Sequence, residues 1–494
     1  MSKERVKSQD LGITRYQLFC VIAASASSIN SGWNLAVTNI AGDIITKCLG
    51  GPQRSIGGLP SCIPTSDIVW GVAVGAYALG ALCGALSSTK FSNKYGRRWV
   101  LLYSNVVGLG ASVVLALSAN IAMVMVGRVA AGIAQGAANG TFTTYVVEIT
   151  TPRARTSLAS MTQMAVSTGM LLAFALSLAA LEPPLWRVLF GVTGMLCIVS
   201  MALMCLCVES PRWLGMNGRA AQAEAALVRL RSGADVTEEL DLITMTASNG
   251  GSSRTASVVE LLCGRTPDNL RHQLLVAVGL MFFQQASGIS SIGFFSTTLF
   301  SSISSSSNSA HDVSKPTVPQ ELSVVLMAAG AAATLGGMFL AGYWGRRPLL
   351  LAGHGGMAVF SVLVAAGNLA AAPRLAVGAV FLYFIIFFIG PGPLPWAIPN
   401  ELTPTYASAA VMAVNNSVCY LGIFIVGLAF APLLSLTGGY TFLIFAATNA
   451  AAFVFLLLFL PETKDGDVAE LVAVHSVGIH RVWPVKRKCV TPND

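Results

Sequence analysis

The sequence predicts an all-α integral membrane protein of twelve helices, built as two six-helix halves in a parallel repeat. Its composition is the first indication, because 54% of its 494 residues are hydrophobic and only 11% are charged, whereas a soluble domain has about 25% charged residues. Apolar runs near 20 residues long with few charges are typical of membrane helices. The expected spans are 17–40, 67–88, 99–118, 121–145, 157–181, 187–208, 272–300, 320–342, 349–370, 374–400, 408–433 and 439–460.

A repeat along the chain is the second indication, since short polar motifs return after about 250 residues. Each copy falls at the polar end of an apolar run. Matching halves with several spans each are typical of transporters whose substrate site lies between the halves. The copies pair Tyr95-Gly96-Arg97-Arg98 with Trp344-Gly345-Arg346-Arg347, Glu148 with Glu401, and Glu209 with Glu462.

Four regions follow from the spans. The long polar stretch between the halves contains Ala220–Arg231 and Val236–Thr246, whose helical spacing predicts short amphipathic helices in a linker. The serine-rich stretch 301–319 is expected to be an outer loop. The regions are 1–208 for the N-terminal half with helices 1–6, 209–271 for the cytoplasmic linker, 272–460 for the C-terminal half with helices 7–12, and 461–494 for a cytoplasmic tail.

The distribution of arginine and lysine predicts that both termini are cytoplasmic. With the N-terminus inside, an even number of spans returns the C-terminus inside, and most basic residues then face the cytoplasm. The net charge of +8 is therefore a topology signal with some affinity for an anionic inner leaflet, not a nucleic-acid footprint. We expect a multi-pass protein, in the plasma membrane rather than an internal one.

Two cysteines differ from the others. Cys48 and Cys62 both fall in the first outer loop, whereas the remaining cysteines lie in apolar spans or on the inner side. An oxidising exterior favours a disulfide between them. Two free thiols are the alternative.

Several short motifs occur in a fixed order over residues 17–465. They are Gly32-Trp33-Asn34, the paired Gly-Arg-Arg turns, Gly127-Arg128, Pro152-Arg153-Ala154-Arg155, Glu209-Ser210-Pro211-Arg212-Trp213, Gln284-Gln285-Ala286-Ser287-Gly288-Ile289, Gly390-Pro391-Gly392-Pro393-Leu394-Pro395-Trp396 and Pro461-Glu462-Thr463-Lys464. Together they resemble the sugar porter family of the major facilitator superfamily, in particular its facilitative glucose transporters. The resemblance implies the twelve-helix major facilitator fold and transport of a hexose-like sugar by alternating access.

A sugar is neutral and covered with hydroxyl groups, so its site needs amides and an aromatic platform rather than charges. The resemblance assigns Gln163 to sugar binding, and Gln284 and Gln285 in helix 7 are polar residues in a span, which are usually functional. Trp396 follows the proline-broken part of helix 10, where its ring can stack on a pyranose. Helix–helix hydrogen bonding for the glutamines and core packing for the tryptophan are the alternatives.

The chain departs from the glucose-transporter pattern at four positions. Ser290, Gly330 and Cys419 stand where the family has asparagine, and Phe388 stands where it has glutamate. Asn415, one turn before Cys419, is expected to supply an amide in its place, with Asn416 as the alternative and helix–helix bonding as the other interpretation of both. These losses put glucose in doubt more than transport, so the substrate is a hexose, another polyol or something less polar.

Arginines and carboxylates at the cytoplasmic helix junctions are expected to form a gate. A Gly-Arg-Arg turn can bond a carboxylate and helix-end carbonyls and so lock the inner side. The positive-inside rule alone is the other interpretation of these arginines. We assign Arg128 to the same network, and the resemblance assigns Phe294 and Phe295 to an outer gate. The gating candidates are Arg97, Arg98, Glu148, Arg153, Glu209, Arg346, Arg347, Glu401 and Glu462.

Coupling to protons is not expected. Proton-coupled sugar porters carry an aspartate at the helix 1 position that Asn34 occupies here, and an amide does not titrate near neutral pH. Facilitated diffusion is therefore the main prediction. The alternatives are a proton-coupled symporter and a non-transporting nutrient receptor on the same scaffold. No enzyme activity, cofactor or metal is expected, the partners are a sugar or polyol and the bilayer, and the oligomeric state is left open.

Overall fold

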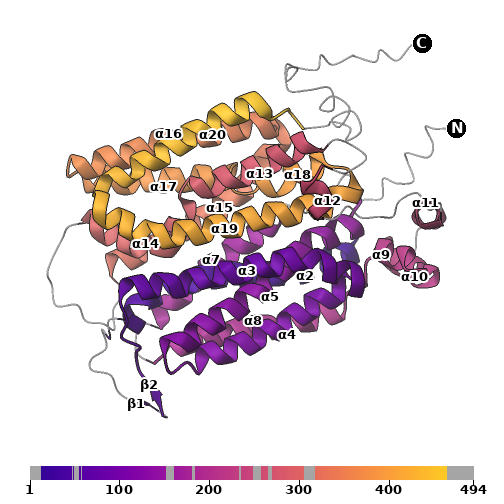
Figure 1. Ribbon diagram of the computed structural model, residues 1–494, viewed down its shortest axis with the longest axis horizontal. Helices are drawn as coiled ribbons and strands as arrows, with labels where there is room; N and C mark the ends of the chain where they lie inside the picture. Colours follow the sequence, from indigo (N-terminus) through magenta and orange to yellow (C-terminus); the bar gives the residue numbers. More distant parts are fainter. Residues whose placement is uncertain are drawn as a thin grey trace.

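The computed structural model describes residues 13–46, 48, 55–56, 58–151, 161–180, 184–232, 235–248, 258–264, 270–304 and 317–463. It contains two bundles of long helices that lie side by side, the first indigo to magenta and the second orange to yellow (Figure 1). The N-terminal half contains α2 (Arg15–Thr46), β1 (Ser55–Ile56), β2 (Leu59–Pro60), α3 (Asp67–Tyr95), α4 (Arg97–Ala116), α5 (Ile121–Ile149), α7 (Met161–Ala179) and α8 (Trp186–Cys205).

The C-terminal half repeats this arrangement with two of its spans broken. It contains α13 (Arg271–Ala286), α14 (Ile289–Ser304), α15 (Val318–Trp344), α16 (Arg346–Leu369), α17 (Pro373–Ile389), α18 (Leu394–Leu402), α19 (Thr405–Thr437), the 3-10 turn η1 (Gly438–Tyr440) and α20 (Thr441–Phe459).

Within the described residues, eleven segments are long and apolar enough to cross a membrane. They coincide with eleven of the twelve predicted spans. The first predicted span lies within α2, which has 32 residues but contains asparagines and serines that lower its hydropathy. In α2 these polar side chains are buried against other helices, so the helix does not present them to lipid.

Small residues set the packing of the N-terminal half. α3 lies against α5 along most of its length, and a Cβ atom added at Gly80, Gly84, Gly132 or Gly136 would overlap a backbone carbonyl of the other helix. Close approach through small residues is the usual way in which membrane helices associate, because lipid supplies no hydrophobic drive between them.

The seventh and tenth membrane spans, called helix 7 (α13 and α14) and helix 10 (α17 and α18), are each broken in the middle. The prolines and glycines of 390–393 predict the break between α17 and α18. The predicted span over 272–300 is present as Arg271–Ser301, but it consists of two helices, because α13 ends at Ala286 and Gly288 takes the left-handed backbone conformation with φ 88°. The Tyr383 hydroxyl donates a hydrogen bond to the Ser287 carbonyl that this break frees, at 2.6 Å.

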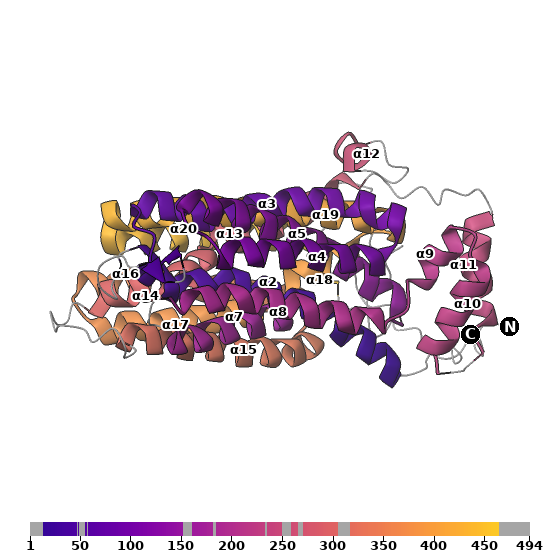
Figure 2. The same ribbon diagram turned by 90° about the horizontal axis from the view of Figure 1, so that it is seen from below.

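The two ends of the bundle differ. The linker helices α9 (Pro211–Met216), α10 (Ala220–Leu230) and α11 (Thr237–Ser248) lie beyond one end, with α12 (Val258–Leu262) near the same end (Figure 2). α10 and α11 closely match the two predicted amphipathic helices. The β1–β2 hairpin lies at the opposite end (Figure 1). Most of the predicted tail, 464–494, and much of the loop 301–319 fall outside the described residues.

Candidate functional site

A cavity lies between the two halves. Its empty volume is about 810 Å³, which includes space open to solvent. One wall comes from α2, α5 and α7, and the other from α13, α14, α17, α18 and α19. The breaks in helices 7 and 10 therefore adjoin the cavity, where irregular backbone is tolerated inside a membrane protein.

Five of the six residues that the sequence predicts for the substrate site line this cavity, and so does Phe294 of the predicted outer gate. Asn415 and the second predicted outer-gate residue, Phe295, do not. Asn415 is fully buried outside the lining, where its amide donates to the Pro395 carbonyl at 3.2 Å. Its face of α19 points to α18, so it acts as the helix–helix contact that the sequence left as an alternative. Phe295 packs on Phe430, with ring centroids 5.7 Å apart. The predicted residues on the lining are Gln163, Gln284, Gln285, Ser290, Phe294 and Trp396.

Gln284 uses its amide within the protein. Its Nε2 donates to the carbonyls of Pro391 and Gly392, both at 2.8 Å. These carbonyls lie in the break between α17 and α18, where no helical N–H satisfies them. Gln284 therefore ties α13 to the break in helix 10 while it lines the cavity.

The neighbouring Gln285 is also satisfied internally. Its Nε2 donates to Gln284 Oε1 at 3.2 Å and to Cys419 Sγ at 3.3 Å. Its Oε1 accepts from the Ser290 hydroxyl at 2.7 Å. Two of the four departures from the glucose-transporter pattern, Ser290 and Cys419, are thus the partners of one glutamine.

The other two departures, Gly330 and Phe388, are neighbours in space. A Cβ atom added at Gly330 would lie 2.5 Å from Phe384 Cε1 and 3.1 Å from Phe388 Cδ2. The rings of Phe384, Phe387 and Phe388 form a continuous cluster on the lining, with neighbouring centroids 4.7 and 5.1 Å apart. We call these three residues the aromatic wall. It fills the space that a side chain at Gly330 would need.

Gln163 and Trp396 keep free hydrogen-bonding groups. Gln163 on α7 is 8% exposed and lines the cavity. Over the described part of the chain, neither its side-chain amide nor the indole N–H of Trp396 on α18 makes a hydrogen bond with the protein. A bound molecule with hydroxyl groups can therefore bond both without displacing a protein partner.

Sequence reasoning missed a polar cluster on the lining. Asn139 Nδ2 donates to Ser31 Oγ at 3.0 Å and to the Tyr420 hydroxyl at 2.9 Å. This cluster joins α5 in the N-terminal half to α19 in the C-terminal half. The available signal was an asparagine in the middle of a span, because polar residues there are costly.

The Gly-Arg-Arg turn of the N-terminal half forms a compact junction at the linker end of the bundle. Arg97 bonds Glu148 through two nitrogens, at 2.8 and 2.9 Å, and both side chains are less than a tenth exposed. The Glu209 carboxylate accepts the backbone N–H groups of Arg97 and Arg98 at the start of α4. Burial raises the pKa of Glu209 above its ordinary value, although the backbone N–H groups around it act in the opposite direction.

The C-terminal half repeats the main contacts of this junction. Arg346 bonds Glu401 at 3.1 Å, with both side chains 15% exposed. Glu462 accepts the backbone N–H groups of Arg346 and Arg347. Gly345 has φ 91° and Gly96 has φ 100°, and each glycine lies against the carboxylate of its own half. The second arginine caps a helix in both halves, since Arg98 donates to Cys205 O and Arg347 to Leu457 O.

These described ion pairs join helices of the same half. Arg97 and Glu148 join α4 to α5, and Arg346 and Glu401 join α16 to α18. These pairs therefore do not lock one half to the other. Arg153, which the sequence assigns to the same network, lies outside the described residues.

The assignment of Arg128 to the cytoplasmic network is wrong. Arg128 and Glu148 are 20 residues apart on α5, which separates them by about 30 Å along the helix. Arg128 is fully buried and donates to the carbonyls of Asn34 at 2.7 Å and Val74 at 3.1 Å. Its guanidinium lies over the Tyr77 ring, 4.8 Å from the centroid. No aspartate or glutamate is on the cavity lining that the structure describes.

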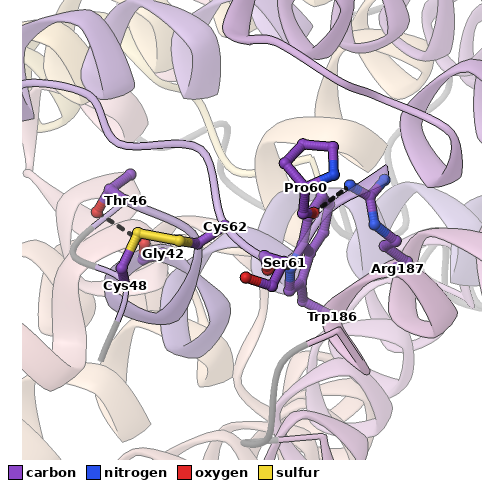
Figure 3. The surroundings of a disulfide bond; sticks show 8 residues. All are labelled: Gly42, Thr46, Cys48, Pro60, Ser61, Cys62, Trp186 and Arg187. Atoms are coloured by element: carbon purple, nitrogen blue, oxygen red, sulfur yellow. Dashed lines mark hydrogen bonds between the residues drawn. A yellow bond between two sulfur atoms is a disulfide. The ribbon is translucent and has the colours of Figure 1, made fainter. Parts of the chain in front are cut away.

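The hairpin end of the bundle is closed by several contacts. Asn39 on α2 donates to the Gly293 carbonyl at 3.0 Å and accepts from Thr297 at 2.9 Å, both on α14. Cys48 and Cys62 form a disulfide with Cα atoms 5.4 Å apart (Figure 3). This distance satisfies the sequence prediction of a bridge.

Two side chains from α8 hold the same loop in place. The Trp186 indole donates to the Ser61 carbonyl at 2.8 Å, and Arg187 donates to the Pro60 carbonyl at 2.7 Å (Figure 3). The guanidinium of Arg187 also lies 4.2 Å from the Trp186 ring centroid. The described loop residues Pro60, Ser61 and Cys62 are therefore held by two hydrogen bonds and the disulfide.

Comparisons with known proteins agree with this arrangement. The family model described as "Sugar (and other) transporter" matches residues 19–474. Facilitated glucose transporter protein 1 of Caenorhabditis elegans is 27% identical over 95% of this chain and 92% of its own. Solute carrier family 2, facilitated glucose transporter member 4 of Bos taurus is 30% identical over 97% of this chain and 94% of its own.

Solved structures share the fold. A proton:xylose symporter, XylE, bound to 6-bromo-6-deoxy-D-glucose superposes with a TM-score of 0.77 at 21% identity, covering 93% of this chain and 99% of that one. An inward-open structure of the same transporter from E. coli gives a TM-score of 0.70 at 20% identity, over 93% and 100% of the two chains. The fold is that of the major facilitator superfamily. With its family match over nearly the whole length, this chain belongs to the sugar transporter family.

Proposed function

We propose that this protein carries a hexose-like sugar or polyol across the plasma membrane by facilitated diffusion. The observation that carries the proposal is the cavity between the halves, which combines free amide and indole groups with aromatic rings and no carboxylate among its described lining residues. Neutral polyhydroxylated molecules fit such a lining, since they need hydrogen-bonding groups and an apolar platform rather than charges. The facilitated glucose transporters among the relatives support the same substrate class.

Within this proposal, Gln163 and Trp396 contact the sugar directly. Gln163 offers a donor and an acceptor with no protein partner, and the Trp396 ring offers a stacking face beside its N–H. Gln284 and Gln285 line the same space with their N–H groups already used. By bonding the helix 10 break, Gln284 fixes the position of Trp396, which follows the break, for contact with the sugar.

Alternating access needs two closures on opposite sides of the cavity. The bonds from Asn39 to α14 support an outer closure, with Phe294 on the cavity side of it. The repeated arginine–carboxylate junctions support rigid inner ends for each half. Sugar binding then needs only to favour one closure over the other.

The orientation of the chain follows from chemistry at the two ends. A disulfide forms in an oxidising compartment, so the hairpin end faces outward. The arginine junctions and the linker helices then lie in the cytoplasm, as the positive-inside rule requires.

Among the described residues that line the cavity, there is no carboxylate to carry a coupled proton. Asn34 bonds the Asn30 carbonyl and side chain, and both residues are buried amides. An amide does not exchange a proton near neutral pH. Uptake therefore follows the sugar gradient.

The test uses pure protein in liposomes loaded with unlabelled hexose. Labelled hexose outside should enter transiently above its external concentration by counterflow, and a protonophore should leave this uptake unchanged. Liposomes without protein are the control. Absence of counterflow for every hexose and polyol tried would refute the proposal, and net accumulation that a protonophore abolishes would replace facilitated diffusion by symport.

A further inference from the structure

The two sides of the cavity offer a substrate different chemistry. On the side of α13 and α19, the N–H groups of Gln284 and Gln285 are all donated within the protein, and Ser290 donates to Gln285. A hydroxyl group of a substrate can bond these residues only by displacing one of those bonds or by using a remaining carbonyl lone pair. Gln163 and Trp396 carry no such prior bonds.

The aromatic wall has no hydrogen-bonding capacity at all. Phe384, Phe387 and Phe388 are each less than 5% exposed, and they occupy the space next to Gly330. A Cβ atom at Gly330 would lie 2.5 Å from Phe384 and 3.1 Å from Phe388, so the rings take the place that a polar side chain at this position would need. A hydroxyl group pressed against this wall gives up its bonds to water and receives nothing in return.

We infer that the preferred substrate is a sugar with an apolar edge, such as a hexose that lacks one ring hydroxyl or the terminal hydroxyl, and that Phe384 and Phe388 determine this specificity. The inference rests on the proposed transport function. The apolar edge lies on the aromatic wall, and the remaining hydroxyl groups bond Gln163 and the Trp396 indole. A fully hydroxylated hexose enters the same cavity with one hydroxyl unsatisfied.

The size of the effect follows from the cost of that unsatisfied hydroxyl. An apolar pocket discriminates against an added hydroxyl by roughly 10- to 100-fold. We therefore expect at least one monodeoxy hexose to be preferred over its parent by roughly 10-fold or more. The panel of deoxy positions identifies which edge of the sugar meets the wall.

The experiment measures competition against counterflow of a labelled hexose in liposomes that hold the full-length protein. The competitors are glucose, galactose and mannose and the monodeoxy analogue of each at every position. Phe388→Tyr adds only a hydroxyl to the aromatic wall and should bring the ratio of parent to deoxy inhibition close to one. Phe384→Tyr is the second variant, in case the first does not fold. Phe381→Tyr is the matched control, because Phe381 is on the same helix, packs on Phe300 and is outside the cavity lining, and it should keep the wild-type ratio.

Each outcome decides one of the two claims. Normal counterflow in which each parent hexose equals or exceeds its deoxy analogues would overturn the apolar edge and leave the proposed function standing. A deoxy preference that survives in both folded tyrosine variants would overturn the assignment to the aromatic wall. Counterflow with neither parent nor deoxy sugars would refute the transport function, and this inference with it.

Discussion

The two halves agree closely at the linker end of the bundle and differ in the cavity. At the linker end, a glycine with positive φ, an arginine–carboxylate pair and a second carboxylate on a helix N-terminus recur in both halves. In the cavity, the N-terminal side offers the unbonded amide of Gln163, whereas the C-terminal side offers the aromatic wall, two glutamines that are bonded internally and the indole of Trp396.

This difference distinguishes contacts that stabilise the fold from contacts that are available to a substrate. Each six-helix half must hold its inner ends together, so both copies of the junction keep the same chemistry. In the proposed function the cavity binds one asymmetric sugar, so its two walls need not match. Repeated contacts therefore mark structural roles, and contacts that differ between the halves mark the recognition of substrate.

The largest effect is expected from breaking the two junctions separately. Arg97→Ala leaves Glu148 buried and unpaired, which costs about 3–5 kcal/mol of stability. Arg346→Ala costs less, about 1–3 kcal/mol, because its pair is more exposed and Glu401 keeps the Thr463 hydroxyl. Both losses are measured as changes in the melting temperature of the detergent-solubilised protein, with size-exclusion chromatography as the readout of the folded fraction.

The exposed Arg374 provides the control for this pair, and Arg374→Ala should not change the melting temperature. Equal losses at Arg97 and Arg346 would show that the burial difference between the junctions has no energetic meaning.

The disulfide tests whether the N-terminal half has a stiffer outer end. Replacing Cys48 and Cys62 by serine removes a constraint on a loop with a separation of 14 residues, worth about 3 kcal/mol at most. The variant should melt at a lower temperature, and reductant should lower the wild-type melting temperature by a similar amount. Complete alkylation of both thiols in protein purified without reductant would show that the bridge does not form.

The glycines of the repeated turns test whether the junctions are equivalent. Alanine at Gly96 or Gly345 would hold a positive φ and press on Glu209 or Glu462, at a cost of about 1–3 kcal/mol in each half. Gly110→Ala is the control, since nothing lies near its added Cβ, and it should be neutral or slightly stabilising. If one turn tolerated alanine and the other did not, the repeat at the inner ends would be only superficial.

The sequence predicts the spans and the junctions well because both depend on local patterns. Apolar runs of helical length mark the membrane helices, and the Gly-Arg-Arg turns with their glutamates recur at matched spacing. The break in helix 10 is predicted from its prolines. The break at Gly288 is not, because a single glycine in a span is usually accommodated in the helix and hydropathy carries no sign of its backbone conformation.

The cavity is predicted less completely because it depends on which face of a helix meets which neighbour. Asn415 has the correct residue type and helix, but its face meets α18 instead of the cavity. Arg128 was assigned by its residue type and not by its depth along α5. The internal bonds of Gln284 depend on where the helix 10 break lies in space, and no sequence pattern gives that position.

In the proposed transport function, the unbonded Gln163 binds the sugar while Gln284 holds the helix 10 break. The direct test is the half-saturation constant for counterflow in Gln163→Ala and Gln284→Ala, measured beside the melting temperature of each. Gln163→Ala should raise the half-saturation constant by about tenfold with little change in melting, because one hydrogen bond to the substrate is lost. Gln284→Ala should lower the melting temperature more and the affinity less, since it leaves the carbonyls of Pro391 and Gly392 unsatisfied. The reverse pattern, with affinity lost at Gln284 and unchanged at Gln163, would contradict the account.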